Sequence, residues 1–215
     1  MYRLILYFVF VLVIAHGCKP ASYLKTPNNV FKKQGTLYML NGAEKKGAIT
    51  INLGNEHTQS IYILLTTAAG EEKISPDSIG SYKIGEDHFF PKKIDLYFEG
   101  AKRFLFVKRL TKENSRIQLY ELYQEARETV DGLNDNYYYF ISLPGQGRLE
   151  AWSSASKNLV PDFNLKMSIQ VKDCPALAQK IMEKKKGYFF AQYTMAYSKK
   201  LEVLKRIIEE YNNCR

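Results

Sequence analysis

The sequence contains few of the residues from which active sites and metal centres are usually built. It has three cysteines, three histidines and one tryptophan among 215 residues. The G-x-S-x-G elbow, the P-loop, the H-E-x-x-H zinc motif and the G-x-G-x-x-G fingerprint do not occur. No C-x-x-C pair occurs either, so the cysteines do not resemble a zinc site. We therefore expect no metal and no cofactor, and we assign no residue a catalytic role.

Composition excludes further classes of protein. Hydrophobic residues make up 46% of the chain, too many for a disordered protein, and 7 Pro and 13 Gly are too few for a collagen-like one. The longest apolar run, Leu4–Ala15, has twelve residues, whereas a membrane-spanning helix needs about 20. A chain of this length is expected to fold as one domain that buries about 70% of its unfolded surface.

The N-terminal residues have the pattern of an export signal. Arg3 supplies a positive charge before the apolar run, and the run has the length of a signal-peptide core, about 7–15 residues. The small residues Ala15 and Gly17 stand at −3 and −1 relative to the bond after Gly17. We predict that residues 1–17 are a signal peptide. An uncleaved anchor helix is the alternative.

The run Ala15-His16-Gly17-Cys18 resembles the lipobox of bacterial lipoprotein precursors. Gly17 and Cys18 match that pattern, whereas leucine is typical in place of Ala15, and alanine or serine in place of His16. The resemblance implies that Cys18 receives a diacylglyceryl thioether and a fatty acid such as palmitate. It also implies a place in the cell envelope, at the outer membrane more than the inner, because Lys19 is not the aspartate associated with inner-membrane retention. A plain secreted protein with an incidental Cys18 is the alternative.

Residues 18–35 are predicted to form a flexible, lipid-anchored tether. They include Pro20, Pro27 and the basic residues Lys25, Lys32 and Lys33, and no acidic residue occurs before Glu44. The tether would rest on anionic headgroups or act as a soluble spacer.

The remaining residues, 36–215, are predicted to form a single α+β domain. Short alternating segments separated by turns, such as Ser60–Thr67 with Ile61, Ile63 and Leu65 on one face, favour an antiparallel β-meander. This meander would be a sheet, a sandwich or a partly open barrel. Residues 163–171 alternate strictly and are predicted to be a last strand, although part of the pattern also fits a helix.

An antiparallel helix pair is predicted to follow, over about residues 174–213. Asp173 is expected to cap the first helix, with Pro175 in its first turn and Gly187 at its end. The second helix is expected from about Gln192. This helix pair would bring Cys174 and Cys214 close together. Once Cys18 is acylated, these two cysteines are the only ones left, and an even number of cysteines suits a disulfide, so we predict one between them.

Two groups of residues are candidates for ligand chemistry. Glu86, Asp87 and His88 form one polar group, and with His57 they could act as acid and base or bind a metal. Solvated loops explain the same residues. The second group is Tyr137, Tyr138 and Tyr139, a possible ligand surface on one strand, although such rings are more often cross-strand packing.

These observations favour an exported, membrane-anchored envelope protein that binds or scaffolds a partner and is not an enzyme. Its partners would be membrane lipid, through the Cys18 acyl anchor, and an envelope protein or glycan. The formal charge of +9 is spread over many turns, so no nucleic-acid partner is expected. The alternatives are a secreted hydrolase and a glycan-binding module.

Overall fold

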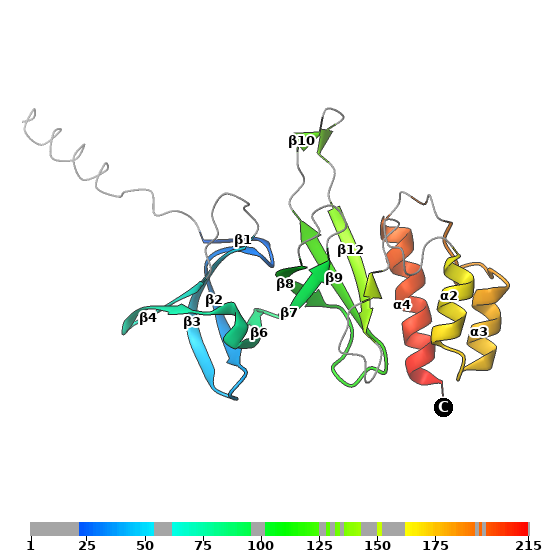
Figure 1. Ribbon diagram of the computed structural model, residues 1–215, viewed down its shortest axis with the longest axis horizontal. Coiled ribbons are helices and arrows are strands. Elements are labelled where there is room, and N and C mark those ends of the chain that lie inside the picture. The colour runs from blue at the N-terminus through cyan, green and yellow to red at the C-terminus, as the bar shows by residue number, and fades with distance from the viewer. Residues whose placement is uncertain are drawn as a thin grey trace, which may run out of the picture.

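The protein is an α+β domain in which one open antiparallel sheet is followed by three helices (Figure 1). The computed structural model describes residues 22–53, 62–95, 102–124, 128–129, 132–133, 136–142, 150–151, 162–191, 194 and 197–214. The strands are β1 Tyr23–Thr26, β2 Asn29–Met39, β3 Glu44–Asn52, β4 Ile63–Thr67, β5 Gly70–Ile74, β6 Ile79–Ile84, β7 Asp87–Asp95, β8 Lys102–Arg109, β9 Gln118–Gln124, β10 Glu128–Thr129, β11 Gly132–Leu133, β12 Asn136–Ser142 and β13 Glu150–Ala151. The helices are the short 3-10 turn η1 Pro76–Ser78 and the α-helices α2 Phe163–Gln170, α3 Pro175–Met182 and α4 Tyr197–Asn213.

The sheet is a meander with one return. Its order is β13-β12-β9-β8-β7-β6-β2-β3-β4-β5, and β1 pairs with β2 outside this path. Strands β2 to β5 are sequential neighbours, and β6 then returns to the other side of β2 and continues the meander through β7, β8 and β9. Strands β10 and β11 form a separate two-stranded ribbon.

Alternation along the strands builds the core, as the sequence predicted. In β4, Ile63 and Leu65 are fully buried while the residues between and after them are not. Predicted Ile61 lies outside the described residues. One apolar cluster covers β2, β3, β4 and β6 on a single face and includes Leu37, Ile49 and Tyr82. Because successive side chains point to opposite faces, half of each strand supplies this cluster.

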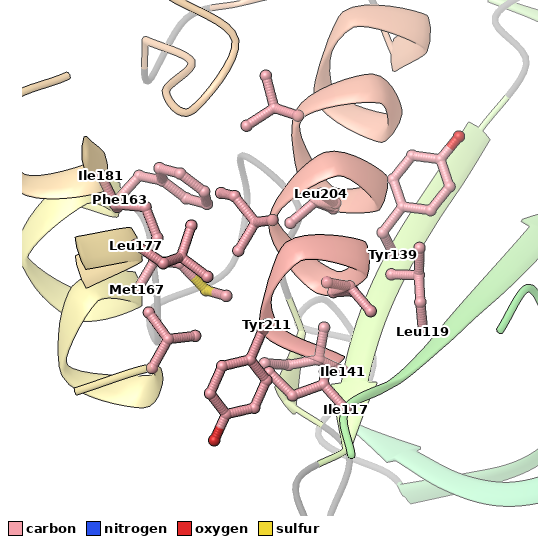
Figure 2. Packing of buried hydrophobic residues seen from close by; sticks show 14 of the residues in the cluster. Ile117, Leu119, Tyr139, Ile141, Phe163, Met167, Leu177, Ile181, Leu204 and Tyr211 are labelled. Carbon is pink, nitrogen blue, oxygen red and sulfur yellow. The ribbon is translucent and has the colours of Figure 1, made fainter. Parts of the chain in front are cut away.

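The helices cover the other end of the same sheet. Helix α4 lies against β9 and β12, and α2 and α3 pack on its far side (Figure 1). Figure 2 shows Leu204 and Tyr211 of α4 between the strand residues Leu119 and Ile141 and the α2 residue Met167. The buried positions of α4 are Lys200, Val203, Leu204, Ile207, Ile208 and Tyr211. Their spacing of three and four residues gives a stripe broad enough to contact both layers.

Phe163–Gln170 form helix α2 and Val171 follows directly after it, so the prediction of a last strand over residues 163–171 is wrong. Phe163, Met167 and Val171, four residues apart, are buried against α4. Leu165 and Ile169 are 48% and 55% exposed, although strict alternation would have buried them with the other three. The three buried side chains lie on one face of a helix with a period of 3.6 residues, and burial on that face decides between the two patterns.

The predicted helix pair is present within a larger group of three helices. Helix α3 begins after Cys174, not after Asp173, and α4 begins at Tyr197. Gly187 has a positive φ of 87° but lies beyond the end of α3, which stops at Met182. Asp173 does not cap the helix because its carboxylate is bonded to Arg116 and Tyr211.

The prediction of a flexible tether up to residue 35 is also wrong for its larger part. Strand β1 covers Tyr23–Thr26, and β2 begins at Asn29, so ordered β structure starts well before residue 36. Thr26, Asn28 and Val30 are buried. The polar composition of this segment suggested a linker, but alternate residues pack on the sheet.

The turn between β1 and β2 is joined to the centre of the sheet by Asn28. Its side-chain amide donates to the Phe106 carbonyl (3.0 Å), and its side-chain oxygen accepts from the Phe106 N–H (2.7 Å). The Tyr82 hydroxyl donates to the Pro27 carbonyl (2.6 Å) beside it. Strand β9 pairs only with the last two residues of β8, so Asn28 takes the place of a strand at Phe106. Pro91 of β7 lies opposite Phe106. Because the backbone N–H and C=O groups of Phe106 are hydrogen-bonded to Asn28, Pro91 does not need an N–H group to pair with Phe106.

Candidate functional site

A small cleft beside the β1–β2 turn is lined by charged side chains from several strands of the sheet. Its volume is about 150 Å³. The lining residues are Leu24, Lys25, Thr26, Pro27, Asp87, Phe89, Lys108, Glu121 and Tyr123. Asp87, Lys108 and Glu121 come from three neighbouring strands, β7, β8 and β9.

Three of the four charged residues of this cleft, Asp87, Lys108 and Glu121, neutralise one another in part. Lys108 Nζ lies 2.7 Å from Asp87 Oδ1, and Lys108 stands directly opposite Glu121 in the β8–β9 register. Burial raises the pKa of the Glu121 carboxyl, while Lys108 and a hydrogen bond from Tyr139 oppose the rise. The cleft could hold a small polar group. Ligand pockets usually measure about 300–1,000 Å³, so this cleft is smaller than a usual ligand pocket.

A second hollow of about 440 Å³ lies over β2, β3 and β4 and is open to solvent. Gly47 in its lining leaves no room for a side chain, because a Cβ there would lie 2.6 Å from the Thr66 carbonyl oxygen. Lys46 is the single charged residue of its lining. With one charged residue and no convergent acid and base in its lining, this hollow has the character of open surface.

Asp87 and His88 lie on opposite faces of β7, so Glu86, Asp87 and His88 do not form one site. Asp87 faces the cleft, whereas His88 Nε2 is 2.9 Å from Ser81 Oγ and its ring lies 4.4 Å from that of Phe90. Glu86 is exposed in the turn before β7.

His57 lies outside the described residues. In the described ranges, no group of three His, Cys, Asp or Glu side chains could hold a metal.

His88 is expected to remain neutral to a lower pH than an ordinary histidine. Burial lowers its pKa, the cations of Arg109 and Lys83 lower it further, and Glu113 acts in the opposite direction. A depressed folded-state pKa gives stability that is present above the unfolded pKa and is lost as the pH falls through the folded one.

We therefore expect stability to decline between about pH 7 and pH 5 in part through His88. The variant His88→Gln, which keeps a hydrogen-bonding side chain near Ser81, should decline less. Urea unfolding midpoints across this range check the difference, and an NMR titration of the His88 ring checks its pKa. A ring pKa at or above about 6.5 would contradict the expectation.

The tyrosines predicted as a ligand surface are divided between the two faces of β12. Tyr139 is buried under α4 (Figure 2), so it is not available to a ligand, and that part of the prediction is wrong. Tyr138, half-buried, packs on the opposite face with Leu122 and Phe140. Tyr137 is half-buried and its ring lies 4.8 Å from that of Tyr123. Side-chain alternation separates the rings, so they do not form one stacking row.

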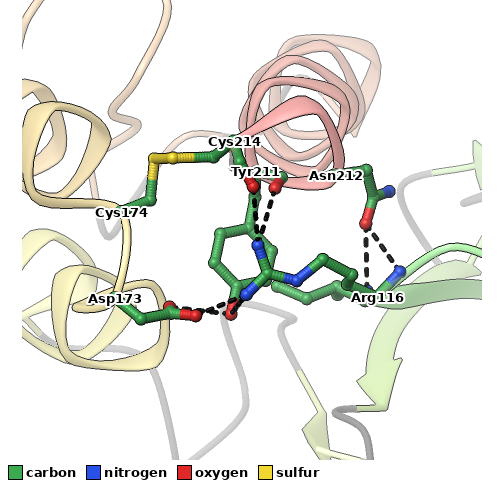
Figure 3. A network of polar contacts seen from close by, with 7 residues as sticks. Arg116, Asp173, Cys174, Tyr211, Asn212 and Cys214 are labelled. Atoms are coloured by element: carbon green, nitrogen blue, oxygen red, sulfur yellow. Dashed lines mark hydrogen bonds and ion pairs between the residues drawn. A yellow bond between two sulfur atoms is a disulfide. The ribbon is translucent and has the colours of Figure 1, made fainter.

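The predicted disulfide between Cys174 and Cys214 is confirmed. It joins the residue before α3 to the residue after α4, with 6.1 Å between the two Cα atoms (Figure 3). Cys174 is buried in the helical cluster. This environment is that of a structural bridge, because a catalytic thiol needs access to solvent and a cationic neighbour that stabilises the thiolate.

Arg116 connects this bridge to the sheet, and the sequence offered no sign of its role. Its guanidinium donates to the carbonyl oxygen of Cys214 (3.0 Å), to the Tyr211 hydroxyl (3.1 Å) and to the Asp173 carboxylate (Figure 3). Asn212 Oδ1 accepts from the Arg116 N–H at 2.7 Å. The hydrogen bond from Tyr211, followed by that from Arg116, lowers the pKa of Asp173. The network satisfies carbonyl groups at the end of α4 and holds the helices on the sheet.

A patch on the β1–β2 hairpin was only partly anticipated. Tyr23, Lys25, Phe31 and Lys32 lie together there, and we call them the hairpin patch. The basic residues were recognised from the sequence. The aromatic ones were not, because the segment was interpreted as a tether.

No family model, curated protein or solved structure matches this chain. Cys18, the predicted lipid attachment, lies outside the described residues. No helix in the part of the chain that the structure describes is long and apolar enough to cross a membrane.

Proposed function

We propose that this chain is an exported, lipid-anchored protein of a bacterial cell envelope that binds or scaffolds a partner without catalysing a reaction. One observation carries the proposal: the basic residue Arg3, the twelve apolar residues Leu4–Ala15 and the small residues before Cys18 occur in the order of a lipoprotein precursor. The anchor would be Cys18, at the outer membrane more than the inner.

The cysteine chemistry supports this proposal. The chain has three cysteines, and two of them form the Cys174–Cys214 disulfide, so Cys18 is the one left for acylation. Disulfides persist in oxidising compartments such as the bacterial periplasm. A bridged pair and one lipidated cysteine leave no free thiol in an exported protein.

The arrangement of polar side chains favours binding over catalysis. Asp87 and His88 are separated by the sheet, and Asp87 is paired with Lys108. General acid–base catalysis needs an acid and a base that converge on one substrate. A hydrolase that used Glu86, Asp87 and His88 together is therefore not supported by their positions.

The variant Cys18→Ser tests the anchor. We expect most of the protein to move from the membrane fraction to the soluble fraction, because two or three acyl chains anchor a protein stably and none remain on serine. Incorporation of a labelled fatty acid should be lost in the same variant. Immunoblots of fractionated cells and the mass of the N-terminal peptide provide the measurements.

His16→Ala is the matched control for this experiment. It changes the residue next to the predicted cleavage site to one that is typical of the lipobox, so membrane attachment should be kept. If Cys18→Ser fractionates like the unmodified chain, the anchor is not at Cys18 and the proposal is wrong.

A further inference from the structure

The hairpin patch combines an exposed and a half-buried aromatic ring, Tyr23 and Phe31, with lysine ammonium groups. Tyr23 and Phe31 are opposite each other in the β1–β2 register, and their rings stack at 5.6 Å. Lys25 Nζ lies 5.4 Å from the centre of the Tyr23 ring, and Lys32 Nζ lies 5.5 Å from that of Phe31. Tyr23 is 38% exposed, more than most large apolar side chains of a folded domain.

Strand geometry turns these side chains outward. Leu24 and Val30 are opposite each other and pack on the sheet, so their neighbours Tyr23 and Phe31 point away from it. Lys25 is exposed at the register irregularity between Leu24 and Thr26. A bulge after Val30 then sets Lys32 at a φ of 47°, and the Lys32 N–H donates to Thr50 Oγ1 (3.1 Å). This left-handed conformation is costly for lysine. It keeps the Lys32 side chain exposed beside Phe31.

The patch lies very near the predicted anchor. Three residues lie between Cys18 and Ser22, the first described residue, and the four Cα steps of at most about 3.6 Å span about 14 Å. The attraction of a lysine to an anionic membrane extends over about one Debye length, roughly 8–10 Å. A lipid on Cys18 would therefore hold the first hairpin within reach of the headgroups.

We propose that the hairpin patch docks on the anionic surface of the membrane that holds the lipid anchor. This inference rests on the proposed function, because the short connection matters only if Cys18 is acylated. Tyr23 and Phe31 would enter the interfacial layer, where aromatic rings with an apolar body are favoured, and Lys25 and Lys32 would contact lipid phosphates. No acidic residue precedes Glu44 in the sequence, so the segment from the anchor through the hairpin carries only positive charge.

Docking gives the domain a defined orientation. The hairpin belongs to the half of the sheet formed by the early strands, and α2 and α3 lie at the opposite end of the long axis in Figure 1. The helical end would then be the part of the domain left open to a partner.

Tryptophan fluorescence in vesicles tests this proposal. Tyr23→Trp, combined with Trp152→Phe to remove the single natural tryptophan, places a reporter in the patch. The processed, lipidated chain is reconstituted in vesicles of phosphatidylglycerol and phosphatidylcholine with brominated acyl chains. We expect the fluorescence of Trp at position 23 to be quenched, and to recover in vesicles of phosphatidylcholine alone.

Tyr62 provides a matched control. It is 37% exposed, and Lys73 Nζ lies 4.6 Å from the centre of its ring, so it reproduces the local chemistry of Tyr23 outside the β1–β2 hairpin, directly before β4. Tyr62→Trp with Trp152→Phe should remain unquenched. Adding Lys32→Gln to the position-23 reporter should lower the docked-to-undocked ratio about fivefold, since each lysine near the surface contributes about 1 kcal/mol. Lys73→Gln should leave that ratio unchanged.

Two separate measurements distinguish this inference from the proposed function. Flotation with vesicles and the mass of the N-terminal peptide report the lipid on Cys18, whereas quenching reports the hairpin. A chain that floats but shows equal quenching at positions 23 and 62 would keep the lipoprotein proposal and overturn docking. Quenching that is the same in phosphatidylcholine alone would also overturn it. A response at position 23 to soluble polygalacturonate and not to vesicles would make the patch a glycan site.

Discussion

Replacing Cys174 and Cys214 together by alanine is expected to lower the free energy of unfolding by about 4 kcal/mol. The bridge closes a loop with a sequence separation of 40 residues, and the chain-entropy model assigns about this value to a loop of that length. Most single domains have only about 5–15 kcal/mol of stability, so the loss is large. The loop contains α3 and α4, hence the helical cluster is expected to be the part most affected.

Urea unfolding of the non-reduced protein measures this loss. The unmodified protein treated with a thiol reductant should unfold at nearly the same urea concentration as the double variant. Cys18→Ser, which leaves the bridge intact, is the control and should unfold like the unmodified domain. Recovery of Cys174 and Cys214 as free thiols in non-reducing mass spectrometry, or equal urea midpoints for variant and parent, would contradict the prediction.

Asn28→Ala is expected to destabilise the domain by about 3 kcal/mol. The Asn28 side chain is 4% exposed and makes two hydrogen bonds with the Phe106 backbone. Removing it leaves the buried N–H and C=O groups of Phe106 without these partners, and each such group costs about 1–3 kcal/mol. The turn between β1 and β2 would also lose its connection to β8.

Asn41→Ala is the control for this second variant. Asn41 Oδ1 also accepts a backbone hydrogen bond, from Ala43 (3.0 Å), but in an exposed turn where water can replace it. Its loss should change stability by no more than about 0.5 kcal/mol. Equal urea midpoints for Asn28→Ala and Asn41→Ala would show that the Phe106 pairing contributes little.

The two variants also bear on the membrane inference in different ways. The disulfide lies in the helical end of the domain, whereas Asn28 lies in the turn of the hairpin that carries the patch. Loosening that turn should weaken the docking of Tyr23, while removal of the disulfide should not. Fluorescence quenching in the same vesicles can separate these effects.

The sequence predicted the fold better than it predicted the candidate ligand-binding residues. Tyr137, Tyr138 and Tyr139 are consecutive, and their separation onto two faces follows from strand alternation alone. Which face would be covered by α4 did not follow, because that depends on contacts between residues about sixty positions apart, such as Tyr139 and Leu204. The hairpin patch was missed for a similar reason. The basic and proline residues of this segment indicated a linker, and its composition did not indicate that Val30 packs on the sheet.

The sequence by itself determined the local character of most of the chain. Alternation in segments such as Ile63–Thr67 indicated antiparallel strands, and the even pair Cys174 and Cys214 indicated the disulfide, because periodicity and cysteine number are properties of the chain itself. The tertiary structure decided the return of β6 beside β2, the helical state of residues 163–171 and the joining of Asn28 to Phe106. These features depend on which apolar face is covered and on partners as far as 78 residues apart, as with Asn28 and Phe106, so local patterns alone did not decide them.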